Sequence, residues 1–459
     1  MQLSITTIQA TDEIEVSVVF RIPAAGGKLT SFEQAEEALA LRLNEIGCGA
    51  TGHLLSACDS NGEALQCDGS KWTSKGRAKR VVETPYPTLC HVYQTSAGGS
   101  TRVPLEERAR LISSATPRMA RMAGMARMVA SKLAAMNGAA VARDMESNHL
   151  RPLSHSYAQD LGCAVAALVT LRTDLTTWQP MSLPADVATV AVGVDGAHMH
   201  TRRDGWRQSM AGTIALYDTS GERLETLYVG GGPGETPPAG KTTFFARMDE
   251  MITLVRARYT QAKVVGLSDG AADLQKYLRT RTDAHLLDFH HAAEHLCAVA
   301  FAFAPEGKAE APAAIAWAAE QRKIMRDEPG GALRVLGELR RRLQPMTKSS
   351  QSSGSCEPSS KRAALSKSAR ATLKGAETYF ANHIGCMDYA GWQGQKLPIG
   401  SGVTEAACKT LIKQRMCQSG MRWSIAASDA LISLRALYLT ASRWDHFWSQ
   451  HNHPTSTAL

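Results

Sequence analysis

The order of apolar segments between residues 187 and 303 limits the fold more than any other feature of the chain. VATVAVGVD (187–195) is an almost unbroken run of small and β-branched residues, which indicates a buried strand. Two further strands, 206–218 and 222–230, are expected on either side of the turn Thr219-Ser220-Gly221. The pattern then alternates, with helices expected at 241–259, 271–280 and 291–303 and strands at 262–269 and 284–289.

Three strands followed by alternating helices and strands predict an α/β fold with a mixed sheet. Parallel strands joined through a helix need right-handed crossovers, which lay helices on both faces of the sheet. This is the ribonuclease H-like arrangement, in which the first and fourth strands are neighbours. We therefore expect residues 187–195 and 262–269 to lie side by side.

An aspartate closes each of these two strands. Asp195 ends VAVGVDGA and Asp269 ends VVGLSDGA, and each is followed by Gly and then Ala. Two carboxylates at neighbouring strand ends are costly to bury unless a cation neutralises them, and the small residues leave room for one. The alternative is that each aspartate merely caps the turn or helix that follows.

A third carboxylate is expected from the segment 398–423. Thr404 would cap a helix running from Glu405 to about Gln418 and ended by Gly420, with Glu405 in its first turn. A glutamate there is also favoured simply by the helix dipole, which is the alternative. The residues expected to face the core are Cys408, Leu411, Ile412 and Met416.

Three carboxylates of this kind point to divalent-metal chemistry on phosphodiesters. Mg²⁺ prefers hard oxygen ligands, and Mn²⁺ is expected to substitute for it. Two ions about 4 Å apart can activate an attacking oxygen and stabilise the leaving one. We therefore predict Asp195, Asp269 and Glu405 as catalytic and metal-binding residues.

Positive charge is concentrated in one part of the chain. Residues 321–375 hold 13 Lys or Arg against 4 Asp or Glu, a larger excess than the net charge of +8 for all 459 residues. A solvated helical surface is one interpretation, and a phosphate-binding surface is the one we favour. Arg340, Arg341 and Arg342 are the candidate DNA contacts in this window.

The amino-terminal part is expected to be mixed and then helical. A strand is predicted at 13–22 and a helix at 31–47, with paired strands at 78–84 and 90–95. From residue 101 the chain turns helical. The helices 138–149 and 154–168 could form a DNA-binding helix-turn-helix or simply part of a helical bundle.

Several classes of protein are disfavoured by composition. MQLSITTIQATDEIEV is acidic and lacks the apolar core of a secretion signal, and no apolar run approaches the ~18 residues of a membrane helix. Ten scattered cysteines favour reduced thiols in the cytosol. Cys48, Cys58, Cys67 and Cys90 lack zinc-ribbon spacing, so no structural zinc is predicted.

These motifs resemble the Kra-type insertion-sequence transposases, a family of bacterial DDE transposases. The resemblance covers nearly the whole chain and implies Asp195, Asp269 and Glu405 as the metal-binding triad, with a helical insertion at 304–395. The stretches that carry it are TPYPTLCHVYQTSAGG, PLEERARLISSATPRMA, VGVDGAHM, GLSDGAADL, LLDFHHAAEHL, LPIGSGVTEAACKTLIKQRMCQSGMRW and LISLRALYLTASRWDHFW.

Asp288 and His291 resemble a signature found near the site in related transposase groups. Both could reach the metal cleft, although an ordinary Asp–His hydrogen bond between strand and helix would explain them equally well. A zinc site through His291 and His295 is conceivable but finds no further ligand at matching spacing. The other candidate DNA contacts are Lys409, Lys413, Arg415, Arg422 and Trp423.

The sequence thus predicts a DNA transposase of a bacterial insertion sequence. Double-stranded DNA at the terminal inverted repeats and at the target is the expected partner, with a homodimer or larger assembly, no membrane, and a cytoplasmic, nucleoid-associated location. The alternatives are a transposase-derived DNA-binding protein without catalysis, and a ribonuclease H-like nuclease or resolvase. The regions expected are 1–100 (mixed α+β, possible end recognition), 101–185 (helical), 186–303 (first part of the catalytic core), 304–395 (basic insertion with a loop at 347–361 and a helix at 361–383), 396–450 (second part of the core) and 451–459 (tail).

Overall fold

The fold is described from a computed structural model of the chain. It describes residues 2–8, 13–19, 32–57, 65–67, 70–72, 74–82, 90–97, 123–171, 183–235, 239–303, 312–344 and 366–452. The chain divides into two compact units, one of residues 1–174 and 433–459 and the other of residues 175–432. Each unit is considered by itself.

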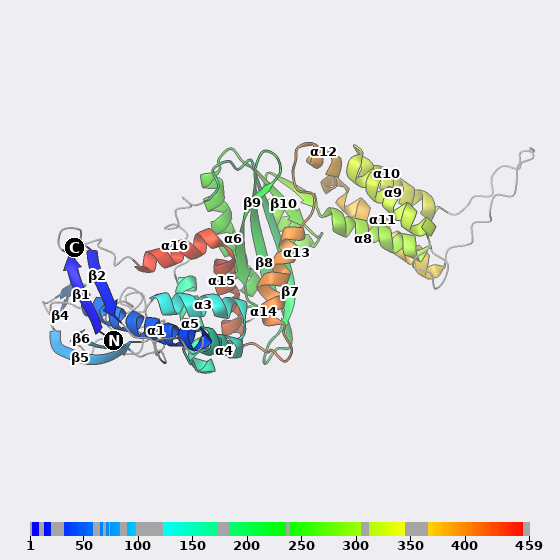
Figure 1. The fold of residues 1–459 in the computed structure, drawn as a ribbon. Coiled ribbons are helices and arrows are strands. Elements are labelled where there is room, and N and C mark those ends of the chain that lie inside the picture. The colour runs from blue at the N-terminus through cyan, green and yellow to red at the C-terminus, as the bar shows by residue number, and fades with distance from the viewer. Residues whose placement is uncertain are drawn as a thin grey trace, which may run out of the picture. The chain divides into compact units, whose positions relative to one another are not determined.

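A five-stranded mixed sheet is the centre of the second unit (Figure 1). The strands lie side by side in the order β11-β10-β7-β8-β9. Strands β7, β8 and β9 form an antiparallel meander, whereas β10 and β11 run parallel to β7. The prediction that the first and fourth strands are neighbours is confirmed. The strands are β7 (Thr189–His200), β8 (Trp206–Tyr217), β9 (Arg223–Gly231), β10 (Lys263–Ser268) and β11 (Ala284–Leu287).

Strand β7 is longer than predicted. We expected it to end at Asp195, but it continues to His200 because its pairing with β8 extends as far as His200 opposite Trp206. Its parallel pairing with β10 stops earlier, at Gly193 opposite Leu267. Asp195 therefore lies just beyond the parallel ladder, inside a strand rather than at its end.

Helices cover both faces of the sheet, as predicted. Val190 and Val192 of β7 pack in one core with α6 (Ala239–Arg258) and α7 (Ala272–Arg279). Ala191, one residue along, packs on the opposite face in a core that contains α8 (Phe289–Ala302). The alternation follows from strand geometry, because successive side chains point to opposite faces.

The described residues of the insertion are mainly helical and share the α8 core. Leu339, Phe380 and Trp392 are buried in the same cluster as Val265 of the sheet. Its helices are α9 (Pro312–Asp327), α10 (Gly331–Leu343), α11 (Lys367–His383), the short 3₁₀ turn Ile384–Cys386 and α12 (Tyr389–Gly394). The predicted loop at 347–361 lies outside the described residues, as do the first residues of the predicted helix 361–383.

The segment that carries Glu405 differs from the single helix that we predicted. Its N-cap is Ser401 instead of Thr404, and α13 (Gly402–Ala407) passes into a π-helical stretch (Cys408–Lys413) and then α14 (Gln414–Met416). Thr404 is inside the helix because its side chain is buried against the sheet. The four residues expected to face the core, Cys408, Leu411, Ile412 and Met416, are all buried. Helix α15 (Ile425–Leu439) follows.

In the first unit, the predicted pairing of residues 78–84 with 90–95 is confirmed by β5 and β6, which are antiparallel. The helix predicted to end at Gly47 instead continues to Ala57, so Gly47 is an interior residue. The strand predicted at 13–22 is present as β2, which ends at Val19, whereas β1, β3 and β4 were not predicted. The described elements before residue 100 are β1 (Gln2–Ile8), β2 (Glu13–Val19), α1 (Phe32–Ala57), β3 (Leu65–Cys67), β4 (Ser70–Trp72), β5 (Ser74–Val82) and β6 (Cys90–Ala97).

In the described range 123–171 of the first unit the helices are α3 (Ala123–Ala135), α4 (Gly138–His149) and α5 (His155–Leu171). The last two match the predicted pair of helices. Asn137 caps α4 by accepting a hydrogen bond from the N–H of Ala140 at 2.9 Å. Helix α16 (Ala441–Asn452) contributes Asp445, which forms an ion pair with Arg127 of α3 at 2.8 Å. Within the described ranges no helix is both long and apolar enough to span a bilayer.

Candidate active site

Asp195 and Asp269 follow the last residues paired between two neighbouring strands, β7 and β10. The β7–β10 ladder ends with Gly193 opposite Leu267, and Asp195 lies two residues further along β7, whereas Asp269 lies in the turn that follows β10. Leu267 packs in the core that contains α8, and residues two apart share a face. Ala191 of β7 packs in the same core, so Asp195, four residues further along that strand, lies on the face that α8 covers.

The carboxylate of Asp195 has two partners. Its Oδ1 accepts a hydrogen bond from the N–H of Gly196 at 2.6 Å, and its Oδ2 lies 3.4 Å from the Sγ of Cys408. Burial, together with the negative charge of Asp195, raises the pKa of the Cys408 thiol well above its usual range. Cys408 is therefore a neutral thiol that donates to the carboxylate.

Asp269 begins the turn after β10, and two contacts fix that turn. Its Oδ1 accepts a hydrogen bond from the N–H of Ala271 at 3.0 Å, and Tyr379 of α11 donates its hydroxyl to the Asp269 carbonyl oxygen at 3.2 Å. Gly270 between them has φ +109°, which other residues rarely adopt. Burial and the charge of Asp269 raise the pKa of Tyr379, so this phenol remains a donor.

Helix α13 approaches the sheet closely because Gly193 has no side chain. A Cβ on Gly193 would lie 2.0 Å from the Oγ1 of Thr404. That hydroxyl instead lies 2.7 Å from the Oγ1 of Thr213 on β8, in a buried pair. Thr404 immediately precedes Glu405, so this contact sets the position of the third acid.

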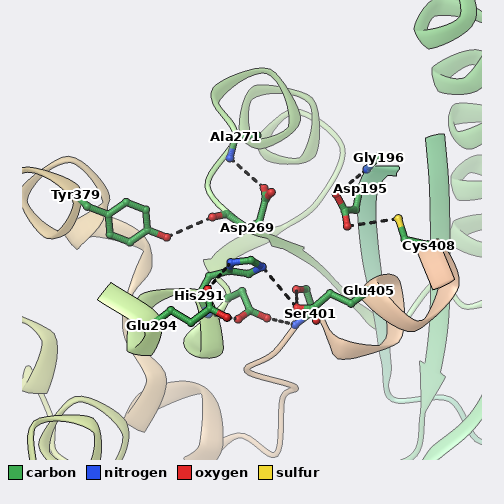
Figure 2. Close-up of polar contacts among 11 residues, drawn as sticks. Asp195, Gly196, Asp269, Ala271, His291, Glu294, Tyr379, Ser401, Glu405 and Cys408 are labelled. Carbon is green, nitrogen blue, oxygen red and sulfur yellow. Dashed lines mark hydrogen bonds and ion pairs between the residues drawn. The ribbon is translucent and has the colours of Figure 1, made fainter. Parts of the chain in front are cut away.

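Glu405 contacts α8 and its own helix cap. Its Oε1 lies 3.5 Å from Nε2 of His291 and 3.3 Å from the hydroxyl of Ser401 (Figure 2). The side chains of Glu405 and His291 are 39% and 36% exposed, so both remain accessible to solvent. Glu405 does stand in the first turn of its helix, so a favourable helix-dipole interaction coexists with these contacts.

Asp288 is fully buried and does not reach the cleft that we expected it to reach. Its Oδ1 caps α8 by accepting from the N–H of His291 at 2.8 Å, and its Oδ2 accepts a hydrogen bond from the N–H of Ser401. Its own N–H donates to the carbonyl of Ser268 at 2.8 Å. The expected contact between Asp288 and His291 is therefore made by the backbone N–H of His291 and not by its ring. The ring contacts Glu405 instead.

The three acids have the chemistry of a site for hard divalent cations, in an open arrangement. Figure 2 shows Asp195 from β7, Asp269 from the turn after β10 and Glu405 from α13 around one region. None of the ion pairs found in the described parts of the chain joins these acids to Lys or Arg. The same parts contain no group of three His, Cys, Asp or Glu side chains close enough to hold a metal ion. The donor set fits such a cation, and binding one requires the acids to draw together.

The zinc site that we considered conceivable through His291 and His295, but did not predict, is not supported by the position of His295. Its ring stacks on Tyr379, with centroids 3.9 Å apart, and points its face toward the phenol. Tyr379 is held in turn by α11, where its carbonyl contacts Nδ1 of His383 at 2.8 Å. His295 therefore belongs to the aromatic packing behind the Asp269 turn.

Of the five candidate DNA contacts after Glu405, three have exposed side chains, one is partly buried and one is buried. Lys409, Lys413 and Arg422 are exposed. Trp423 is partly buried and donates its Nε1 to the carbonyl of Met416 at 2.9 Å. Arg415 is only 2% exposed, with its guanidinium 5.3 Å from the Trp423 ring centroid. Arg415 therefore packs internally, contrary to its predicted role as a DNA contact.

The three arginines of α10 are engaged within the insertion. Arg340 pairs with Glu377 of α11 at 3.0 Å, and Arg341 and Arg342 both pair with Glu338 at 2.7 and 2.5 Å. The guanidinium of Arg342 also lies over two aromatic rings and is only 19% exposed. Arg340 and Arg341 are each 57% exposed, so of these three arginines only Arg340 and Arg341 are accessible to DNA phosphates.

Sequence reasoning missed the residues that support the acids. Gly193, Thr213 and Thr404 form the junction between the sheet and α13, and Cys408 and Tyr379 contact Asp195 and Asp269. A glycine inside the otherwise β-branched run VAVGVD was the one available signal of close backbone approach. The other four have no local signature, because their partners are far away in the sequence.

The chain matches no protein-family model and no curated protein. The likeness of its motifs to a transposase family therefore remains a resemblance. Function has to be inferred from the geometry of the site.

Proposed function

We propose that this protein is a DDE-type DNA transposase of a bacterial insertion sequence, with a ribonuclease H-like catalytic core. The observation that carries the proposal is that Asp195, Asp269 and Glu405, which come from three distant segments, lie around one region of the second unit (Figure 2). Among the described residues they do not yet form a closed group of ligands, so a bound cation would have to draw them together. Among the described residues no Lys or Arg forms an ion pair with these three acids, which leaves their carboxylate oxygens available to a metal ion.

The sheet order supports a ribonuclease H-like core. An antiparallel meander of three strands continued by two parallel strands, with helices on both faces, is the arrangement expected of that fold. The insertion enters after α8 and the third acid follows it, which matches the order implied by the resemblance. Fold alone does not define function, so the acids carry the proposal.

Asp195, Asp269 and Glu405 would hold Mg²⁺, or Mn²⁺ in its place, through carboxylate oxygens. When bound, such ions activate the attacking oxygen and stabilise the leaving oxygen of a phosphodiester. The residues around the three acids hold them in position for metal binding. Cys408 remains neutral beside Asp195, Tyr379 fixes the backbone of Asp269, and His291 holds the side chain of Glu405.

Double-stranded DNA is the proposed partner, both as the terminal inverted repeats and as the target. Lys409, Lys413 and Arg422 are exposed on the segment that follows Glu405, where they can contact phosphates near the acids. Helices α4 and α5 are the candidates for reading bases. Joining two element ends needs at least a homodimer on DNA, and a cytoplasmic, nucleoid-associated location follows from this activity.

The test is Mg²⁺-dependent nicking of a plasmid that carries the DNA flanking the gene. The wild-type protein should nick at the ends of inverted repeats, whereas Asp195→Asn, Asp269→Asn and Glu405→Gln should each lose nicking. Asp273→Asn is the matched control, because Asp273 is an exposed aspartate on α7 paired with Lys241 at 2.9 Å.

Binding of the same DNA is measured for every variant in this test. Loss of nicking with retained binding in the three triad variants supports the proposal. Wild-type protein that binds the repeats without nicking them indicates a transposase-derived DNA-binding protein instead. Nicking of branched DNA in preference to the repeats indicates a nuclease or resolvase.

A further inference from the structure

The far end of the β7–β8 hairpin carries an exposed aromatic ring among arginines. The segment after α14 joins this hairpin, because Trp423 forms an isolated bridge with Thr201 and its N–H donates to the carbonyl of His200 at 3.1 Å. The N–H of Arg202 returns a hydrogen bond to the carbonyl of Trp423 at 2.9 Å. These bonds bring Arg422 beside the hairpin end.

Trp206 is the most exposed large hydrophobic residue in the described ranges, at 64%. It starts β8 opposite His200, whose ring meets the indole edge-on with centroids 5.5 Å apart. One side of the ring is therefore supported by the protein. An indole held in this way loses little conformational freedom when a flat partner stacks on it.

The charges around Trp206 are mostly positive. Arg202, Arg203 and Arg422 are all exposed, and the Nε of Arg202 lies 3.4 Å from the carbonyl of Arg422. The one acid in the loop 201–205 between the two strands, Asp204, lies 3.6 Å from Arg207. Arg207 is also tied to the carbonyl of Gly234 at 2.9 Å and is only 17% exposed. The accessible charges near the ring are therefore those of three arginines and of Asp204, which is 47% exposed, so the net charge of the surface is positive.

We propose that Arg202, Arg203, Trp206 and Arg422, here termed the hairpin surface, bind an unpaired DNA strand. Trp206 stacks on one base and the arginines contact the phosphates on either side, which is the combination that single-stranded nucleic acid requires. DNA as the ligand rests on the proposed function. An acidic protein partner would satisfy the arginines but has no planar group for the ring, so we favour the nucleotide.

The distance from the acids gives the register of this contact. Trp206 pairs with His200, which is five residues along β7 from Asp195. Five residues of strand span about 17 Å, and successive nucleotides of one DNA strand are about 3.4 Å apart. This spacing applies to a stacked strand, and an unpaired strand can be more extended, so the stacked base lies within about five nucleotides of the phosphate that the acids would cleave, in DNA already opened near the element end.

The first test uses the full chain, a fluorescein-labelled thymidine oligonucleotide of about 20 residues and a duplex of equal length, followed by anisotropy. Trp206→Ala should weaken single-strand binding about tenfold, and Trp206→Phe should stay within about twofold, because a phenyl ring still stacks. Leu224→Ala is the control, since Leu224 is 42% exposed on β9 of the same sheet. Equal binding by wild type and Trp206→Ala overturns the proposal.

The second test measures the salt dependence of the same binding. Arg202→Gln combined with Arg203→Gln should reduce the slope of log affinity against log salt by about 1.4, at about 0.7 per phosphate contact. Arg223→Gln is the control, because Arg223 is exposed opposite Tyr217 at the other end of β8. An unchanged slope in the double variant would show that Arg202 and Arg203 do not contact phosphates, which overturns the proposed role of these arginines.

Three further results separate this inference from its rivals. Equal loss of duplex and single-strand binding in Trp206→Ala overturns stacking on an unpaired base. A change of oligomeric state with unchanged DNA binding assigns the surface to a second protein chain and also overturns it. If the wild type never nicks DNA but binds the oligonucleotide through Trp206, the proposed function fails while the hairpin surface stands.

Discussion

The buried carboxylate of Asp288 accepts a hydrogen bond from the backbone N–H of Ser401, 113 residues further along the chain. The same carboxylate caps α8 at His291. Asp288 therefore ties the segment after the second acid to the cap of the helix that carries Glu405. The insertion separates the start of α8 from Ser401 in the sequence, and the Asp288 side chain forms hydrogen bonds with both.

Asp288→Ala should impair both stability and nicking. Two buried N–H groups would lose their acceptor, each at a cost of about 1–3 kcal/mol. Asp388→Ala is the matched control, because Asp388 also caps a helix, α12, by accepting from Gly391 at 3.1 Å, but lies away from the acids. It should cost about 0.5–2 kcal/mol and leave nicking intact. Urea unfolding and plasmid nicking measure the two effects, and equal nicking by both variants would refute the positioning role.

Gly193→Ala tests the close approach of α13 to the sheet. The added methyl would meet the Thr404 hydroxyl, so the helix must move, and overpacking of this kind costs about 1–3 kcal/mol. We expect a large loss of nicking because Glu405 moves with Thr404. Gly375→Ala is the control, since Gly375 is exposed in α11 with open space around it and should become slightly more stable. Full nicking by Gly193→Ala would mean that the position of α13 does not matter.

Tyr379→Phe tests the hydrogen bond from the insertion to the Asp269 turn. The variant keeps the ring that stacks on His295 and loses only the hydroxyl that contacts the Asp269 carbonyl. Nicking should fall about tenfold, with stability changed by no more than about 1.5 kcal/mol. Tyr389→Phe is the control, because the structure gives the buried Tyr389 hydroxyl no hydrogen-bond partner within its described residues. Identical nicking by the two variants would count against coupling between α11 and Asp269.

His285 should make the protein less stable in acid. Burial, followed by the charges of Arg279 and His383, lowers the pKa of His285 to about 4 from its ordinary 6.5. Between these values the unfolded chain binds the proton and the folded protein does not, so stability is intact above about pH 6.5 and falls as the pH drops toward 4. The loss below pH 4 is up to about 3 kcal/mol.

Urea unfolding across pH 4–7 measures this dependence. His285→Gln should flatten it, because an amide can keep the contact that His285 makes with the hydroxyl of Ser268 at 2.9 Å without titrating. His290→Gln is the control, since His290 is exposed on α8. An unchanged pH dependence in His285→Gln would show that another group is responsible.

The sheet and most of its helices could be predicted from the sequence because each has a local pattern. The run 187–195 was recognisable from its β-branched residues, and the alternation of strands and helices gave the order that places β7 beside β10. The end of β7 could not be predicted, because it depends on pairing with β8 as far as Trp206. Gly47 did not end α1, since an isolated glycine weakens a helix without necessarily stopping it.

The three acids could be nominated from sequence, but not the residues that hold them. Asp195 and Asp269 share the motif Asp-Gly-Ala after apolar runs, and that pattern is visible in the chain. The contacts of Cys408 and Tyr379 with these acids exist only in the folded molecule. Arg415 was predicted as a DNA contact because charge is visible in a sequence, whereas its burial against Trp423 is not.

The account depends most on the claim that Asp195, Asp269 and Glu405 together bind divalent cations. Titration of the full chain with Mn²⁺, followed by electron paramagnetic resonance of the free ion, measures this without any assumption about the DNA. Wild type and Asp273→Asn should bind about two ions, and Asp195→Asn, Asp269→Asn and Glu405→Gln should each lose at least one of them. Mn²⁺ binding that is the same in all five proteins would contradict the account.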